Sequence, residues 1–140
     1  MTIHSKISTY MSNWDEVIQC YTTQISSIAD RFYEHTSPED TTYYRDIKQR
    51  IDKIKEHTQY IDQECIKIYD NLSVRHYKSI STRMQDIKNA CRLIFDISDV
   101  PDVSGQFHEI YQSFLRAIYH VSRELHKVVN DGIVQFEKAI

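Results

Sequence analysis

Residues 47 to 72 carry an apolar or small side chain at every third or fourth position, and this spacing is the strongest constraint on the fold. Isoleucine recurs every seven residues at Ile47, Ile54, Ile61 and Ile68. A second series with the same spacing runs between them and consists of Ile51, Thr58, Cys65 and Leu72. Alternating steps of three and four residues place side chains along one stripe of an α-helix. The segment is therefore predicted to be a helix that packs against other helices.

The same steps occur in three further segments, which run from Ile7 to Phe32, from Tyr77 to Ile94 and from Phe107 to Val128. A strand would need alternation with a period of two instead. Helices are predicted at about residues 7–35, 38–71, 73–97 and 103–138. Four amphipathic helices with short connections favour an all-α, single-domain, antiparallel four-helix bundle with up-down-up-down topology.

The composition supports this fold, because the chain has only two glycines and two prolines. Average proteins contain about 7 and 5 per cent of these residues, and sheet proteins need them for their many tight turns. Three of these four residues mark predicted helix boundaries. Ser37 and Pro38 suit the cap and first position of a helix, and Pro101 and Gly105 indicate a loop before the last helix.

The boundary between the second and third helices has no such residue. The step from Leu72 to Tyr77 is five residues, which breaks the register of the stripe. A break is therefore predicted near residues 70–73, with Asn71 or Ser73 as a cap. One long kinked helix is the alternative.

Gly132 interrupts the last helix, and beyond it the apolar stripe rotates to Ile133, Phe136 and Ile140. Glycine is about 1 kcal/mol less favourable than alanine in a helix. Fraying or a bend is expected there.

Thr58 and Cys65 are smaller than the isoleucines around them in the second helix. The interpretation favoured by the sequence is that they pack opposite large aromatic residues. The candidates for that space are Trp14, Phe32, Phe107 and Phe114. The alternative is a pocket beside Cys65.

Charge and cysteine usage bear on partners and location. The net charge of −3 gives no global attraction to nucleic acid or anionic membrane, and no run of about 18 apolar residues predicts a membrane span. The first residues lack the apolar core of a signal peptide. Three cysteines without a C-x-x-C pair indicate reduced thiols and a cytoplasmic protein, although export without a signal peptide would leave the same pattern.

The histidines raise a metal hypothesis. His120 and Glu124 lie one turn apart on a predicted helix, and His57 and Glu64 on another helix could contribute. Helical di-metal bundles use paired Glu-x-x-His motifs, and the chain has none. The histidines are interpreted as solvated and no cofactor is expected; a metal- or cofactor-binding bundle using His120 and Glu124 is kept as an alternative.

Catalytic motifs are absent from the sequence. Cys20, Cys65 and Cys91 fall on or beside apolar stripes, where a thiol is normally buried and protonated. There is no G-x-S-x-G, glycine-rich phosphate loop or H-E-x-x-H motif. The chain is predicted not to be an enzyme.

The predicted third helix is basic. Between residues 73 and 95 there are five lysines and arginines and one acid, a local charge of +4. Four of the cations share a face away from the apolar stripe and define a basic strip of Arg75, Lys78, Lys88 and Arg92. The simplest interpretation is a solvated face that pairs with acids on the first two helices. The alternative is a docking strip for an acidic protein or for the phosphates of a nucleic acid.

Ten tyrosines are the other compositional excess, and several fall outside the apolar stripes. Tyrosine is enriched at protein interfaces. Tyr60 and Tyr69 are the predicted anchors of an interface that Tyr33 or Tyr119 would extend. The sequence therefore favours a non-enzymatic protein–protein interaction module, such as a small adaptor, regulator or inhibitor, that binds a partner or forms a homo-oligomer. A nucleic-acid-associated protein using the basic strip is a further alternative.

Overall fold

The computed structural model describes residues 3–35, 41–100 and 106–140, and nearly all of them are helical. The four long helices are α1 (Ile3–His35), α2 (Thr41–Asp70), α3 (Tyr77–Ser98) and α4 (Gln106–Ala139). A short 3₁₀ turn, η1 (Val74–His76), precedes α3. No strand occurs in the described ranges, so the predicted all-α fold is confirmed. The helix starts predicted at residues 38 and 103, together with the Ser37 cap, lie outside those ranges.

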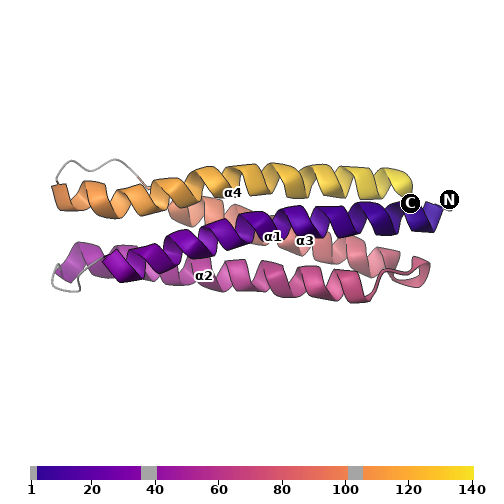
Figure 1. Cartoon of the computed structure of the whole chain (residues 1–140), viewed down its shortest axis with the longest axis horizontal. Helices are drawn as coiled ribbons and strands as arrows, with labels where there is room; N and C mark the ends of the chain where they lie inside the picture. The colour runs from indigo at the N-terminus through magenta and orange to yellow at the C-terminus, as the bar shows by residue number, and fades with distance from the viewer. Residues whose placement is uncertain (1–2, 36–40, 101–105) are drawn as a thin grey trace.

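Each helix packs against the next one along the chain, and α4 closes the ring by packing against α1 (Figure 1). Both termini lie at the same end of the bundle, because successive helices run in opposite directions (Figure 1). The up-down-up-down topology is therefore confirmed. Among the described helices, none combines the length and the hydropathy needed to cross a lipid bilayer.

The predicted stripe of α2 faces the core along the whole helix. Its members within the helix are no more than 3% exposed, and they are Ile47, Ile51, Ile54, Thr58, Ile61, Cys65 and Ile68. Leu72, just beyond the helix end, is half-buried. Burying an aliphatic side chain of this size contributes about 1.5–3 kcal/mol. The α2 stripe is therefore a main source of the stability of the bundle.

The buried stripe of α4 differs from the predicted one at several positions. Leu115 and Val129 are buried in place of their half-buried neighbours Phe114 and Val128. An α-helix has 3.6 residues per turn, so its inward face drifts relative to a seven-residue repeat. Ile140, placed on the stripe by the sequence, is 57% exposed. The side chain of Phe107 lies outside the described part of the chain.

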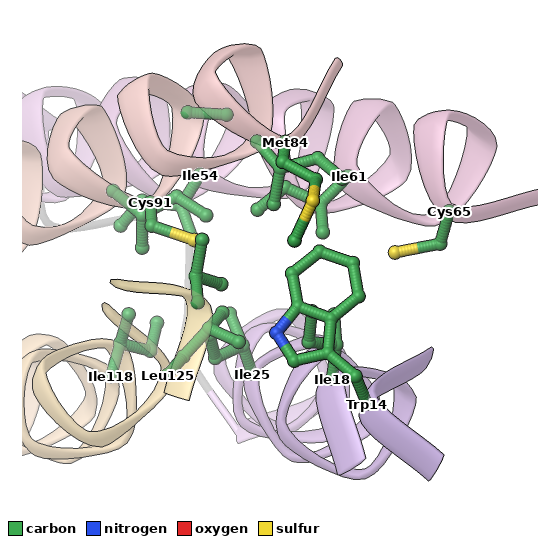
Figure 2. Packing of buried hydrophobic residues seen from close by; sticks show 14 of the residues in the cluster. Trp14, Ile18, Ile25, Ile54, Ile61, Cys65, Met84, Cys91, Ile118 and Leu125 are labelled. Atoms are coloured by element: carbon green, nitrogen blue, oxygen red, sulfur yellow. The ribbon is translucent and has the colours of Figure 1, made fainter. Parts of the chain in front are cut away.

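Thr58 and Cys65 are buried packing residues, as predicted. The Thr58 hydroxyl donates to the carbonyl of Ile54 one turn earlier, at 2.7 Å, so its polar group is satisfied inside the helix. The Cys65 side chain is 1% exposed, and its thiol points toward the indole ring of Trp14 on α1 (Figure 2). The small side chain of Cys65 therefore lies opposite a large aromatic one.

Gly132 does not end or fray α4, which continues to Ala139. This corrects the expectation from helix propensity. A Cβ atom at Gly132 would lie 2.0 Å from Nε1 of Trp14, closer than real atoms approach. The same indole N–H donates to the carbonyl of Val128 at 3.2 Å. Gly132 therefore provides the space in which the tryptophan packs against α4, and packing on both sides stabilises the helix despite its glycine.

The predicted break between the second and third helices is confirmed, and they are separate helices. The Asn71 side chain donates to the carbonyl of Lys67 at 2.7 Å and so caps the last turn of α2. Ser73 does not cap α3; its hydroxyl lies 2.7 Å from Nδ1 of His76. Because η1 occupies residues 74–76, α3 begins four residues later than the sequence predicted.

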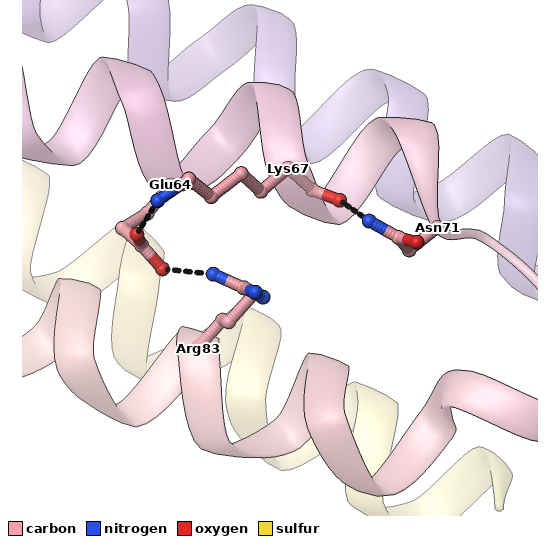
Figure 3. A network of polar contacts seen from close by, with 4 residues as sticks. All are labelled: Glu64, Lys67, Asn71 and Arg83. Carbon is pink, nitrogen blue, oxygen red and sulfur yellow. Dashed lines mark hydrogen bonds and ion pairs between the residues drawn. The ribbon is translucent and has the colours of Figure 1, made fainter.

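A buried carboxylate joins α2 to α3 (Figure 3). The Glu64 side chain is only 5% exposed, and Arg83 of α3 donates to one of its oxygens at 2.9 Å. Lys67 pairs with the other oxygen at 3.1 Å. The carboxylate is thus satisfied from both helices, which fixes how α2 and α3 lie along one another.

Polar contacts also cross from α1 to α2. The Thr22 hydroxyl donates to Asp62 at 2.7 Å, and Lys55 pairs with Asp30 at the same distance. Burial raises the pKa of Asp62, although the bond from Thr22 acts in the opposite direction. These contacts lie at the edge of the core and set the pairing of the two helices.

Candidate functional site

A basic groove runs between α3 and α4. It has a volume of about 540 Å³, within the range of pockets that bind small ligands. Its lining residues, which define the basic groove below, are Lys88, Asn89, Arg92, Phe95 and Asp96 of α3 and Arg123, His126 and Lys127 of α4. Four lysines and arginines against one carboxylate give it a charge of +3.

The groove uses only half of the predicted basic strip. Lys88 and Arg92 lie one turn apart on the side of α3 that faces α4. Arg75 is an exposed residue of η1, and Lys78 is exposed in the first turn of α3. Ten residues of helix, about 15 Å, separate Lys78 from Lys88. Neither Arg75 nor Lys78 lines the groove.

Six of the eight groove residues were not found from the sequence, and three of these come from α4. Arg123, His126 and Lys127 share one face of α4, since they are three and four residues apart. That spacing was visible in the sequence. Their relation to the basic strip was not, because it depends on α3 and α4 being antiparallel neighbours in one register.

The cations of the basic groove are largely without acidic partners. Within the described ranges, Lys88, Arg92 and Arg123 form no ion pair, and Lys127 has only a 3.4 Å pair with the exposed Glu124. The sequence suggested that the cations of the third helix pair with acids of the first two helices. Arg83 does so, since it is bound to Glu64 of α2, but Arg83 is not part of the basic strip. The basic groove therefore keeps its charge available to a ligand.

A second groove, between α2 and α3, provides a contrast. Its volume is about 490 Å³, and it holds both acids and cations. Arg50 lies 3.5 Å from Asp46 and donates to the backbone carbonyl of Ile97 at 2.9 Å, and Lys53 pairs with Glu56 at 3.6 Å. These charges neutralise one another locally, unlike those between α3 and α4.

His126 is the titratable group of the basic groove in the physiological range. Partial burial lowers the pKa of its imidazole, and the nearby charges of Lys88 and Arg92 lower it further. Two cations on the opposite helix thus disfavour the imidazolium form. The neutral ring can donate one N–H to an anion and can also take up a proton.

Aromatic residues lie beneath the basic groove. Phe95 lines it and packs on Tyr119 of α4, with ring centroids 4.6 Å apart. Tyr119, a predicted interface residue, is half-buried by this contact and also touches His120 edge-on. It supports the wall of the groove and is not a free side chain on the surface.

The predicted tyrosine anchors are exposed but separate. Tyr60 is 39% exposed and Tyr69 is 56% exposed. Nine residues correspond to about two and a half turns, so the two rings lie on opposite flanks of α2. Tyr60 lies near Glu64 and Arg83 on the flank toward α3, whereas Tyr69 lies two turns beyond Asp62, on the flank toward α1. The structure does not bring them into one surface.

Tyr33 is engaged within the bundle. It is half-buried, and its hydroxyl donates to Asp52 of α2. The ammonium groups of Lys55 and Lys48 lie 5.5 and 6.0 Å from its ring centroid. Burial, and then Asp52, raise the pKa of this phenol. Tyr33 therefore joins α1 to α2.

The suggested metal ligands have other neighbours. His120 and Glu124 are both exposed, and Glu124 pairs with Lys127. Glu64 is already held by Arg83 and Lys67, so it is not available beside His57. In the part of the chain that the structure describes, no three His, Cys, Asp or Glu side chains come together as metal ligands would.

Two of the three thiols are buried and protonated. Burial raises the pKa of Cys91 to about 12. Burial, and then Asp15, also raise the pKa of Cys65. Cys20 is exposed on α1. A thiol held in its protonated form is a poor nucleophile, so neither buried cysteine offers nucleophilic chemistry.

No family model, no curated protein and no solved structure matches the chain.

Proposed function

We propose that this protein is a non-enzymatic interaction module that binds an acidic segment of a partner protein in the basic groove between α3 and α4. The observation that carries the proposal is that two helices bring four cations to one groove, and three of them form no ion pair within the described ranges. Such a module acts as an adaptor, a regulator or an inhibitor. A second copy of the chain is one possible source of the acidic segment.

The dimensions of the basic groove favour an extended or helical peptide. On each helix the cations are four residues apart, which is about 6 Å along the axis. A peptide lying along the groove would therefore meet two rows of positive charge. Phe95 offers it an apolar contact between those rows.

The charge of the whole chain disfavours nucleic acid as the main ligand. The chain carries −3 and the basic groove +3, so the remaining residues together carry −6. A nucleic acid presents phosphates along its whole length and gains affinity with each phosphate neutralised. Outside the groove the chain is negative in sum, which opposes the extended binding of a nucleic acid, whereas a short acidic peptide need not reach beyond the groove.

The test is the affinity of a synthetic oligo-aspartate peptide for the full chain at low and at physiological salt. We expect binding that weakens with salt. We expect Arg92→Ala/Arg123→Ala to weaken it at least about tenfold, since a hydrogen bond to a charged group contributes roughly 1.5–3 kcal/mol. Arg75→Ala/Lys78→Ala is the matched control. It removes the same charge from the basic strip outside the groove and should keep most of the affinity.

Three outcomes would count against the proposal: no binding by the wild type, an equal loss in the control variant, or tighter binding of single-stranded DNA of the same net charge. Sedimentation velocity over a range of concentrations then separates a partner protein from a second copy. If the chain self-associates and Arg92→Ala/Arg123→Ala makes it monomeric, the acidic segment is its own.

A further inference from the structure

We propose that binding of an acidic segment in the basic groove is coupled to proton uptake by His126, so that acidification strengthens binding. This rests on the proposed function, because it concerns the same groove and the same ligand. It adds regulation by pH, which the cations alone do not provide, since lysine and arginine stay charged throughout the physiological range.

His126 is surrounded mostly by positive charge. Lys88, Arg92 and Asp96 of α3 line the same groove, and so do Arg123 and Lys127 of its own helix. Lys88 and Arg92 both oppose protonation of the imidazole, and so does its partial burial. At neutral pH and without a ligand, the neutral form of the ring is therefore favoured.

An acidic ligand reverses this balance. Its carboxylates neutralise Lys88 and Arg92 and provide an acceptor for the second N–H of a protonated ring. A carboxylate within about 4–6 Å raises the pKa of a histidine by roughly 1–3 units. Covering the ring removes water from it and lowers its pKa, but the ring is already half-buried, so the direct charge interaction is the larger effect.

The direction of the pH dependence follows from the difference between the pKa of His126 in the complex and its pKa in the free protein. Because the pKa of His126 is higher in the complex than in the free protein, the extra affinity is fully present below the free-state pKa. It is lost as the pH rises through the pKa of the complex. Each unit of difference strengthens binding about tenfold over the full range.

The first experiment measures the affinity of the oligo-aspartate peptide between about pH 8 and pH 5, where aspartate stays ionised and histidine titrates. We expect the wild type to bind at least about tenfold more tightly at the acidic end, which corresponds to a rise of about one unit or more in the pKa of His126 on binding. Calorimetry in two buffers with different ionisation enthalpies should show proton uptake. His126→Gln should bind with an affinity that is almost independent of pH. His120→Gln is the control, since His120 is exposed on the same helix outside the groove, and it should keep the wild-type dependence.

The second experiment follows the imidazole resonances of His126 by NMR with and without the peptide. We expect its pKa to rise on binding. The inference is overturned if this pKa stays constant while the peptide binds, or if His126→Gln keeps the full pH dependence. In either case the proposed function would stand. A wild type that fails to bind the peptide at any pH overturns both.

Discussion

Gly132 faces the indole of Trp14, and its missing side chain allows α1 and α4 to approach each other there. Helix propensity describes glycine as a weakness at this position, because an isolated helix gains from alanine. In the bundle the same residue provides the space for a buried aromatic ring whose N–H reaches the backbone of α4. At the scale of the residue, glycine at this position lowers the stability of an isolated helix but raises the stability of the packed bundle.

Gly132→Ala should therefore destabilise the protein, although it would stabilise an isolated helix by about 1 kcal/mol. We expect a loss of about 1–3 kcal/mol in the free energy of unfolding, typical of overpacking, measured by urea denaturation. Gln135→Ala, at an exposed site of the same helix, is the control and should change little. In a double-mutant cycle, Gly132→Ala should lower the free energy of unfolding less in the Trp14→Phe background than in the wild type. A gain in stability for Gly132→Ala would show that the ring moves aside freely.

At the scale of the element, the apolar stripes bring helices together, and polar pairs select how they are aligned. An aliphatic stripe can slide by one turn and still be buried. The Glu64 carboxylate can be satisfied by Arg83 in one alignment of α2 and α3 only. The connection between the two helices supports the same alignment. It is short, because Asn71 caps the last turn of α2 and η1 leads directly into α3.

Arg83→Ala should leave the Glu64 carboxylate buried with Lys67 as its remaining cationic partner. We expect a loss of about 1–3 kcal/mol, the cost of an under-satisfied buried polar group, in denaturant unfolding. Arg83 is itself partly exposed, which keeps the loss below that for a fully buried pair. Lys48→Ala removes an exposed pair with Asp52 and should cost no more than about 1 kcal/mol. Adding Glu64→Gln to Arg83→Ala should recover part of the lost free energy of unfolding, because no charge then remains buried. Equal losses for Arg83→Ala and Lys48→Ala would contradict this account.

At the scale of the whole molecule, charge is distributed unevenly over a bundle whose core is continuous. The basic groove collects like charges on one side, while the remaining residues are acidic in sum. The like charges of the basic groove repel one another in the folded state and lower its stability. Proteins commonly tolerate such a loss of stability at sites that bind a ligand.

Removing this repulsion should stabilise the free protein. Arg92→Gln/Arg123→Gln eliminates two like-charged pairs, each with a lysine one turn away, and such pairs cost about 0.2–0.5 kcal/mol apiece. We therefore expect a higher melting temperature than the wild type at low ionic strength. The difference should shrink near 1 M salt, where charges are screened over about 3 Å. Arg31→Gln, at an exposed position of α1 three residues before Glu34, should not show this gain. A double variant less stable than the wild type at low salt would mean that these arginines hold the bundle together.

The sequence by itself predicted the four helices, the buried stripe of α2 and most of the others, and the break between α2 and α3, for which one long kinked helix was the alternative. These features depend on the three- and four-residue steps and on registers such as that of Leu72 and Tyr77, which are local properties of the chain. The opposite flanks of Tyr60 and Tyr69 also follow from helical geometry alone. Only the tertiary structure decided which flanks meet. It placed Lys88 and Arg92 beside Arg123 and His126, paired Glu64 with Arg83, and put Trp14 over Gly132. A helical repeat fixes the angle at which each side chain leaves its own helix. The repeat does not say which helix is the neighbour, whether that helix runs parallel or antiparallel, or how the two are aligned along their axes. These three features decide which charges share a groove.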